Sequence, residues 1–184
     1  MKQIGYHVDR SKSLSAGDCL NLSRPDFFSF SPVFPLMWNE GISKHGMNYL
    51  RKTDSFNSAI IEMNLELVRL SLFKDCFPSR MQSFFIVPSV ESLSSWKNEL
   101  YGDFPVFEIG YETDSCYCFD ASNLLGGIDR DNTINQVLNL LMSFQYWASI
   151  SNPHKSKPEI LIPYPVTIGK CIGLSNALID SCPQ

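Results

Sequence analysis

Apolar and polar residues alternate near both ends of the chain, which is the pattern of half-buried strands. In residues 4–9 apolar side chains occupy every second position, so His7 and Asp9 are expected on the opposite, polar face. Further strands are expected at residues 82–87, 104–111, 115–119, 158–162 and 166–172. Of these, 115–119 is predicted to be the hairpin partner of 104–111.

Three segments show the spacing of helices. In residues 55–73 apolar side chains recur every three or four positions, and the polar side carries charged residues that favour pairs at the surface. Those charged residues are Glu62, Glu66 and Arg69. A second helix is predicted over 133–147, capped by Asp131-Asn132, and a short one from the N-cap Ser89 to residue 100. The apolar face of the second helix is predicted to consist of Ile134, Val137, Leu138, Leu141 and Phe144.

Residues 22–38 are rich in Phe, Pro and Ser, and their prolines oppose a regular helix, so an aromatic loop is expected there. Strands come first, helices lie between, and strands return at the end. This order predicts an α+β fold with a mainly antiparallel sheet and helices packed on it. Composition does not shift along the chain, so residues 1–184 are predicted to form a single domain.

The 184-residue chain carries 15 Lys and Arg against 19 Asp and Glu, a net charge of −4. A surface that is basic all round, as needed to grip nucleic acid over a wide area, is therefore excluded, whereas a local basic groove is not. No apolar run reaches the length of a membrane span, and the first residues lack the apolar stretch of a secretory signal. A cytoplasmic protein without a membrane partner is expected.

The six cysteines are expected to be reduced thiols rather than disulfides. Cys116 and Cys118 form a CxC pair, but the three histidines are scattered, so no metal site is predicted. A metal-binding module built on these two cysteines is the weakest of the functional interpretations.

Sequence motifs for nucleotide-binding loops, zinc proteases and serine hydrolases are missing. Three other features stand out: Tyr6-His7-Val8-Asp9-Arg10, Ser79-Arg80-Met81-Gln82-Ser83, and Tyr146-Trp147 followed by a strand headed by Glu159. Each also has a purely structural interpretation. His7 is compatible with a satisfied structural histidine, Arg80 with a surface pair to Glu62 or Glu66, and Tyr146-Trp147 with the core.

In this order the three features resemble the ADP-ribosyltransferase family. Its members carry a His or Arg on the first strand, a Ser-, Thr- or Tyr-bearing strand in the middle and a Glu on a late strand. Tyr146-Trp147 before Pro158-Glu159-Ile160-Leu161-Ile162 is similar to the end of DNA-modifying ADP-ribosyltransferase toxins. YHVDR, GISKHG and SRMQS also resemble a group of short bacterial proteins placed in that fold.

The resemblance implies a split antiparallel sheet with helices packed on it, and NAD as the substrate. It implies that Glu159 is the catalytic residue, stabilising the positive charge that develops on the ribose. The residues implied to bind NAD are His7, Asp9, Arg10, Arg80, Gln82 and Ser83. Among them Arg80 is expected at the pyrophosphate, with Arg10 as a second phosphate contact, and His7 at the NAD hydroxyls.

The sequence also departs from the family. The tyrosine that stacks on nicotinamide has no clear match, and Phe84, Phe85 and Tyr49 are the candidates. Position 157 is Lys157 rather than a second acid, which argues against arginine as the acceptor.

The resemblance favours DNA or RNA as the acceptor instead, near a basic patch of His154, Lys155 and Lys157. Relatives act as toxins in toxin–antitoxin or phage-defence modules, so an antitoxin or inhibitor protein is an implied partner. The alternative is a catalytically inactive interaction protein that docks through its Phe-rich loop 27–38.

Overall fold

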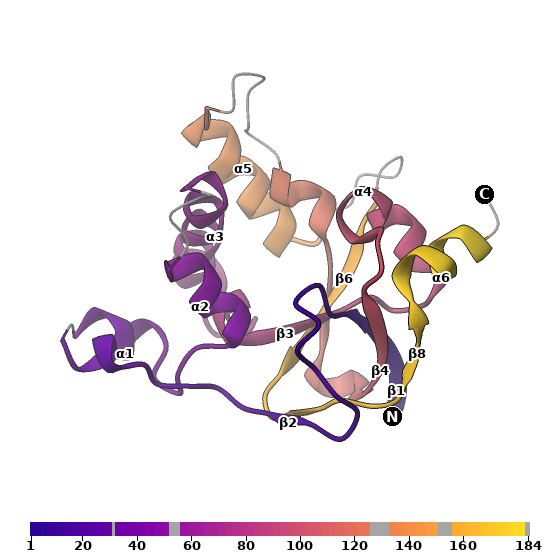
Figure 1. The fold of residues 1–184 in the computed structure, drawn as a ribbon. Helices are drawn as coiled ribbons and strands as arrows, with labels where there is room; N and C mark the ends of the chain where they lie inside the picture. Colours follow the sequence, from indigo (N-terminus) through magenta and orange to yellow (C-terminus); the bar gives the residue numbers. More distant parts are fainter. Residues whose placement is uncertain (31, 52–55, 126–132, 151–155, 183–184) are drawn as a thin grey trace.

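The computed structural model describes residues 1–30, 32–51, 56–125, 133–150 and 156–182 (Figure 1). The strands are β1 Lys2–Val8, β2 Cys19–Leu20, β3 Ser83–Ile86, β4 Pro105–Glu112, β5 Tyr117–Asp120, β6 Pro158–Pro163, β7 Val166–Thr167 and β8 Cys171–Leu174. They pair in the orders β1-β4-β8, β3-β6-β5 and β2-β7, and every pair is antiparallel. The mixed α+β class and the antiparallel sheet are thus confirmed.

The two three-stranded sheets meet where β1 bridges to the end of β3. Tyr6 and Val87 exchange backbone hydrogen bonds of 2.9 and 2.8 Å there. The predicted hairpin between 104–111 and 115–119 is wrong, because β5 pairs with β6. Both edges of β4 are occupied by β1 and β8, which leaves no edge for β5.

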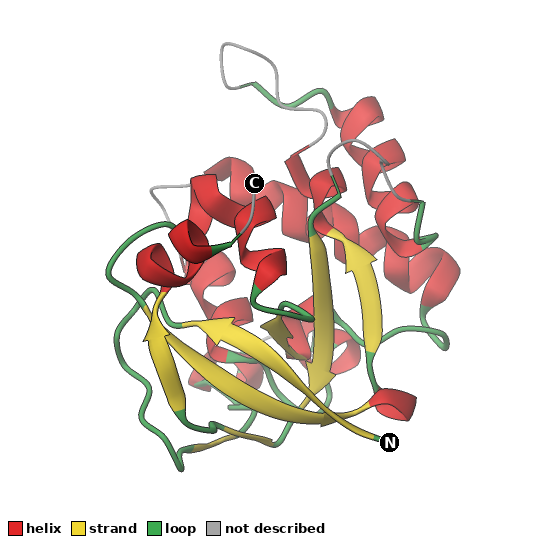
Figure 2. Ribbon diagram, turned by 90° about the vertical axis from the view of Figure 1, so that its right-hand side faces the viewer, coloured by secondary structure: helices red, strands yellow, loops and turns green. Residues whose placement is uncertain are grey.

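In the view of Figure 2 the helices lie mainly above and behind the strands. The α-helices are α1 Val33–Met37, α2 Lys44–Arg51, α3 Phe56–Val68, α4 Lys97–Leu100, α5 Gln136–Trp147 and α6 Ser175–Ser181. A π-helical turn, η2 Arg69–Phe73, prolongs α3, and 3₁₀ turns are η1 Asp26–Ser29, η3 Arg80–Gln82, η4 Glu91–Trp96, η5 Thr113–Ser115 and η6 Ala121–Leu125. The predicted helix 55–73 is therefore α3 with η2, and 89–100 is η4 with α4. No helix among these residues is both long and apolar enough to cross a bilayer.

The chain packs in layers because strand side chains alternate between two faces. Between the two sheets lie buried apolar side chains, among them Phe84, Ile86, Phe107, Ile109, Ile160 and Ile162. The other face of β3-β6-β5 packs on α3 and α5, and the other face of β1-β4 packs on η4 and α6. The two three-stranded sheets thus have apolar packing on both faces.

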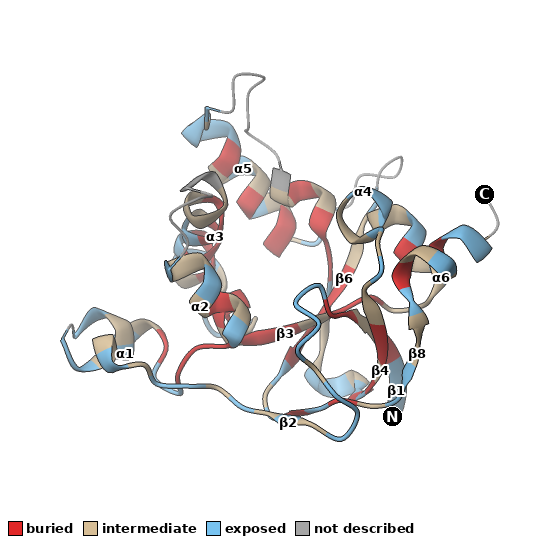
Figure 3. Cartoon of the chain, in the orientation of Figure 1, coloured by how far each residue is buried: buried red, intermediate tan, exposed pale blue. Residues whose placement is uncertain are grey.

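Helix α5 turns a different face to the core than its apolar pattern predicts. Its buried residues are Asn139, Ser143, Tyr146 and Trp147, whereas Val137 is 81% exposed and Leu141 is 50% exposed (Figure 3). The rings of Tyr146 and Trp147 account for this orientation, since both are fully buried and Trp147 Nε1 donates to the Leu65 carbonyl over 2.8 Å. The predicted cap Asp131-Asn132 lies outside the described residues, and Asn135 caps the helix by accepting from Leu138 N over 3.1 Å.

The Phe-rich segment packs largely on itself. Phe27, Phe28 and Phe34 contact one another, and Phe34 stacks on Trp38, which is fully buried. The prolines limit helix here to η1 and the five-residue α1, in which Pro35 is tolerated because it lies in the first turn.

Helix α2 lies directly against the start of β3. A Cβ atom on Gly46 would lie 2.5 Å from the Met81 carbonyl oxygen, so only glycine permits this approach. Ser43 N also donates to that carbonyl over 2.8 Å. The approach brings His45 of α2 beside Phe85 of β3, and Tyr49 of the same helix contacts His45.

Candidate active site

Strand β6 presents Glu159 to the helices and not to the space between the sheets. Ile160 and Ile162 point into the inter-sheet core, so Glu159 and Leu161 face α3 and α5. Glu159 is only 4% exposed. A carboxylate at such a depth requires a charged or hydrogen-bonding partner.

That partner is Arg80, in the turn that leads into β3. Its Nε and Nη2 donate to the two oxygens of Glu62 at 3.0 Å each, in the two-pronged geometry that a guanidinium favours. Its Nη1 donates to Glu159 Oε1 and, over 2.7 Å, to the hydroxyl of Tyr146. The Tyr146 hydroxyl in turn donates to Glu159 Oε1 over 2.6 Å. We call Glu62, Arg80, Tyr146 and Glu159 the ionic cluster.

The ionic cluster contains one cation and two carboxylates away from water. Burial raises the pKa of Glu159 above its ordinary value, and the charge of Arg80 opposes that rise only in part. Burial also raises the pKa of the Tyr146 hydroxyl, which therefore stays a hydrogen-bond donor. Burial lowers the pKa of Arg80, but the charges of Glu159 and Glu62 outweigh burial and raise this pKa well above its ordinary value. Arg80 thus stays charged.

The expectation of surface charge pairs on the helix 55–73 is wrong. Glu62, Glu66 and Arg69 are 4%, 1% and 5% exposed. The predicted pairing of Arg80 with Glu62 is found, but in the interior.

Glu66 belongs to a second buried group, bonded to Arg69 through both its oxygens at 2.7 and 3.0 Å. It also accepts from the Trp38 indole and the Ser79 hydroxyl. The charged residues of α3 are buried because this helix has two buried sides, one on the sheet and one beneath the Phe-rich segment.

His7 of β1 bonds to β3, the strand that follows the turn carrying Arg80. Its Nδ1 lies 2.8 Å from the Phe85 carbonyl oxygen, and its ring lies 4.3 Å from the Phe84 ring. A carbonyl only accepts, so Nδ1 carries the proton of this bond. Burial lowers the pKa of His7 below its ordinary value, more strongly than the Phe85 carbonyl and Asp9 raise it. The imidazole is therefore neutral at pH 7, and Nε2 is an acceptor nitrogen.

Phe85 is the residue at which these groups meet. The Arg80 guanidinium lies 4.6 Å from the centre of its ring, and the His45 ring lies 4.4 Å from it on the α2 side. Tyr49 contacts His45 at 4.6 Å. His7, His45, Tyr49 and Phe85 are all half-buried, and we call them the aromatic group.

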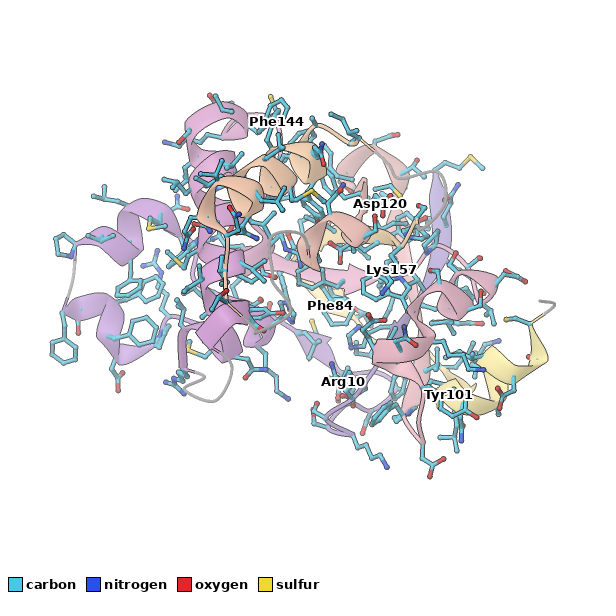
Figure 4. All side chains as sticks on the ribbon, turned by 90° about the horizontal axis from the view of Figure 1, so that it is seen from above. Arg10, Phe84, Tyr101, Asp120, Phe144 and Lys157 are labelled. Carbon is cyan, nitrogen blue, oxygen red and sulfur yellow. The ribbon has the colours of Figure 1, made fainter. Side chains whose placement is uncertain are left out.

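Charges of the ionic cluster, and that of Arg10 in the loop after β1, affect the pKa of the Tyr49 hydroxyl. Burial and then the charge of Glu62 raise the pKa of Tyr49, Glu159 raises it further, and Arg80 and Arg10 lower it. Arg10 itself is exposed (Figure 4).

Four of the six residues expected to bind NAD are bonded to other groups of the protein: Asp9, Arg80, Gln82 and Ser83. Arg80 does not face a pyrophosphate, because its N–H groups are bonded within the ionic cluster and it is only 3% exposed. Ser83 is fully buried and donates to the Ser79 carbonyl over 2.7 Å. Gln82 donates to the Gly41 carbonyl over 2.9 Å and lines a pocket of about 260 Å³ that includes neither His7 nor Glu159.

Asp9 shapes the loop after β1 instead of facing a ligand. Its oxygens accept from Ser11 N and Oγ at 3.0 and 2.7 Å, from Ser13 N at 2.6 Å and from Leu14 N at 2.8 Å. These bonds outweigh the opposing effect of burial and lower the pKa of Asp9. The loop also contacts α2, where Lys44 Nζ donates to Ser13 Oγ over 2.7 Å.

Sequence reasoning missed several residues of this site. Glu62 was assigned to the surface and Tyr146 to the core, and His45 was not singled out. The sequence carried no clear signal for Glu62, because acids on the polar side of an amphipathic helix ordinarily face water. Nothing in the sequence alone shows that Tyr146 reaches Glu159 across helix and sheet.

The predicted basic patch before β6 is only partly within the described residues. His154 and Lys155 lie outside them. Lys157 bonds to Glu99 Oε1 over 2.6 Å and lies above the Trp96 ring, so its charge is already paired. Among the described residues no group of His, Cys, Asp and Glu is arranged to hold a metal ion, around Cys116 and Cys118 or elsewhere.

We expect Arg80→Met to lower the free energy of unfolding by about 3–5 kcal/mol, because it leaves two buried carboxylates without their cation. Urea denaturation monitored by tryptophan fluorescence measures this. Lys97→Met is the matched control: its pair with Asp180 is half exposed, and its loss is expected to cost about 0–1 kcal/mol. Equal effects of the two substitutions would contradict a structural role of Arg80.

We expect Asp9→Asn to cost about 1–3 kcal/mol at pH 7, because the backbone N–H groups of Ser13 and Leu14 lose a carboxylate acceptor. The lowered pKa of Asp9 means that its contribution is present above its unfolded value of about 4 and is lost as the pH falls through the folded value. Urea titrations from pH 7 to about pH 3 should therefore show the two proteins converging in acid. A gap that is constant with pH would refute this role.

One comparison with known proteins gives a match. Residues 5–173, from within β1 to within β8, match the family described as "Protein of unknown function (DUF2441)". No curated protein matches the chain. The matched region includes His7, Arg80, Tyr146 and Glu159, so the whole site lies inside the part that defines the family. The chain therefore belongs to the DUF2441 family, whose function is unknown.

Proposed function

We propose that the protein is an NAD-dependent ADP-ribosyltransferase. The observation that carries the proposal is the convergence on Phe85: His7 of β1 bonds to its carbonyl, and Arg80, which holds Glu159, lies over its ring. His7 and Arg80, which are 73 positions apart in sequence, thus contact one strand residue, and Glu159 is bonded to the second of them. The antiparallel sheet, divided into β1-β4-β8 and β3-β6-β5, supports an ADP-ribosyltransferase-like fold.

In the proposed reaction the bond between the nicotinamide nitrogen and ribose C1′ breaks, and its electron pair leaves with nicotinamide. Positive charge develops on the ribose, and a nitrogen or oxygen of the acceptor then bonds to C1′ and releases its proton to water. A carboxylate near the ribose stabilises that charge more than it stabilises bound NAD, and so it accelerates the step. Glu159 is the residue for this role. Both hydrogen bonds described for it end on Oε1, and Oε2 would accept a ribose hydroxyl.

Arg80 becomes a positioning residue in this proposal. Its guanidinium favours the ionised form of Glu159 against the effect of burial and fixes Oε1 together with Tyr146. The catalytic carboxylate is therefore oriented before the substrate arrives.

The aromatic group would bind the nicotinamide half of NAD. His7 offers Nε2 as an acceptor for a ribose hydroxyl. Of the three candidates for stacking on nicotinamide, Tyr49 fits best: it is half-buried and its hydroxyl senses Glu62 and Glu159. Phe84 is only 6% exposed, and Phe85 is covered by Arg80 and His45. Arg10, which is exposed in the loop after β1, would contact the phosphates.

The acceptor that we propose is DNA or RNA. The protein would act in the cytoplasm as a toxin or phage-defence effector. An antitoxin or inhibitor protein would restrain its activity. The net charge of −4 requires the contact with nucleic acid to be local and sensitive to salt. Incubation with labelled NAD and separate samples of DNA, RNA and cell protein identifies the acceptor. Label on protein alone would redirect this part of the proposal.

We expect Glu159→Gln to reduce the rate of NAD cleavage by at least about a hundredfold, because an amide cannot stabilise the developing positive charge. Initial rates of nicotinamide release measure this. Glu62→Gln is the matched control, since it removes the other carboxylate bonded to Arg80. It should cause a comparable loss of stability and a smaller loss of rate. A Glu159→Gln protein as active as the wild type would overturn the assignment.

We expect His7→Ala to weaken NAD binding by about tenfold or more, because one hydrogen bond to a hydroxyl and its support by Phe85 are lost. Titration calorimetry measures the affinity, and a Glu159→Gln background prevents turnover of NAD during the measurement. Ile4→Ala, on the 53% exposed part of the same strand, controls for effects on β1. Unchanged affinity after His7→Ala would remove His7 from the site.

A catalytically inactive interaction protein is the second candidate. The Phe-rich segment favours it, because Phe30 is 84% exposed and Leu36 of α1 is 80% exposed. Wild-type protein that neither binds nor consumes NAD, with any acceptor added, would support this candidate over the first.

A further inference from the structure

Two adjoining pockets lie beside the Phe-rich segment, apart from the candidate active site. The first has a volume of about 260 Å³ and the second of about 430 Å³, and both are lined by Asn39 and Gln82. Neither lining includes His7, Tyr49 or Glu159. The second pocket alone lies within the range of roughly 300–1,000 Å³ that is usual for sites of small ligands. We call the two pockets together the double pocket.

The buried group around Glu66 forms part of the wall of each pocket. Ser79, which is 2% exposed, lines the first pocket, and Arg69, which is 5% exposed, lines the second. Both side chains are bonded to Glu66, which fixes their positions. The double pocket is therefore built on rigid polar side chains from the interior of the protein.

The second pocket offers hydrogen-bond donors to an anion. A guanidinium has five N–H groups, and four of those of Arg69 donate to Glu66 and to the carbonyls of Lys74 and Phe77. Within the part of the chain that the structure describes, the fifth N–H, on Nη2, has no acceptor. The ammonium group of Lys74 lines the same pocket, is exposed and is bonded to no described residue. Since Glu66 balances the charge of Arg69, Lys74 supplies the net positive charge that a phosphate requires.

The first pocket offers acceptors and an aromatic ring. Gln82 donates through Nε2 to the Gly41 carbonyl, which leaves its Oε1 without a donor among the described residues. Glu40 adds an exposed carboxylate to the lining, and Tyr164 adds a half-buried ring. Acceptors beside an aromatic ring suit a planar base that carries an amino group, such as adenine, because such a base can both stack and donate. Uracil presents an acceptor oxygen in place of the amino group and suits the pocket less well.

The two pockets together select against other ligands. An acyl chain would leave the Arg69 N–H and the Gln82 carbonyl oxygen without partners, which costs free energy. A dicarboxylate would bring its second charge against Glu40. A ligand that is anionic at one end and donates from a planar ring at the other end avoids both penalties. Asn39, which lines both pockets, carries the type of amide that pairs with N6 and N7 of adenine.

We propose that the double pocket binds one adenine nucleotide, with its phosphate at Arg69 and Lys74 and its base beside Tyr164 and Gln82. A free nucleotide and one unit of a single strand present the same chemistry to these residues. The inference is independent of the proposed enzymatic activity, because no residue of the ionic cluster lines either pocket.

Titration calorimetry of the full chain with AMP, UMP and inorganic phosphate tests the proposal. We expect AMP to bind with a Kd below about 1 mM, and at least about tenfold more tightly than UMP or phosphate, because the amide and carboxylate acceptors recognise the amino group. A wild-type protein that does not bind AMP, or that binds UMP as tightly, would overturn the proposal.

Two substitutions in the second pocket should act in opposite directions. Lys74→Met should weaken AMP binding by at least about fivefold, because the phosphate loses its cation. Asp75, which is exposed and lines the same pocket, repels an anion, so Asp75→Asn should strengthen AMP binding by about twofold or more. Lys97→Met is the matched control, since it removes the same charge from an exposed position on α4 outside the double pocket. Because all three side chains are exposed, the fold should tolerate the changes, which circular dichroism verifies.

A single-stranded oligodeoxyadenylate distinguishes the two sources of the nucleotide. Binding that is tighter than that of AMP and is weakened by Lys74→Met supports the proposal with a strand as the source, and binding no tighter than that of AMP supports it with a free nucleotide. His7→Ala should leave AMP binding unchanged, and its loss in this variant would move the nucleotide to the candidate active site and overturn the proposal. Equal AMP binding by the wild type and Lys74→Met would overturn it as well.

Discussion

One guanidinium between two carboxylates, away from water, is the constraint on which the site depends. Arg80 joins Glu62 of α3 to Glu159 of β6, and Tyr146 of α5 completes the group. A turn, a strand and two helices are thereby fixed relative to one another by charged hydrogen bonds with strict geometry. Apolar packing alone is less selective, because side chains of similar volume can exchange at low cost. An interior ion pair need not add net stability, but it disfavours any arrangement that separates its members.

The same contacts link the architecture to the proposed chemistry. Arg80 lies over the ring of Phe85, and His7 bonds to the carbonyl of the same residue. The short β3 therefore positions groups from β1 on one side and from β6 on the other. A catalytic carboxylate that is held by buried partners needs little reorganisation when charge develops nearby, which is how enzymes obtain electrostatic stabilisation.

Much of the fold follows from the sequence, because periodicity records which side chains are buried. Five of the strands and the helices α3, α4 and α5 were predictable in this way, whereas α1, α2, α6, β2 and the division of 166–172 into β7 and β8 were not. Strand pairing was not, since the hairpin predicted for β5 ignored competition from β8 for the edge of β4. The buried face of α5 was also misassigned, because counting apolar positions overlooks the area that Tyr146 and Trp147 bury. For the site, the pattern singled out Glu159 but could not show that its partners come from three different elements.

The loop after β1 has a thermodynamic consequence. Asp9 accepts three backbone N–H groups and one hydroxyl within its own loop, so the segment that carries Arg10 is ordered in the absence of any ligand. The entropy of fixing that backbone is spent during folding and does not have to be spent again on association. A phosphate that meets Arg10 would accordingly encounter a preorganised loop, and its affinity would reflect the new contacts with little deduction for ordering the chain.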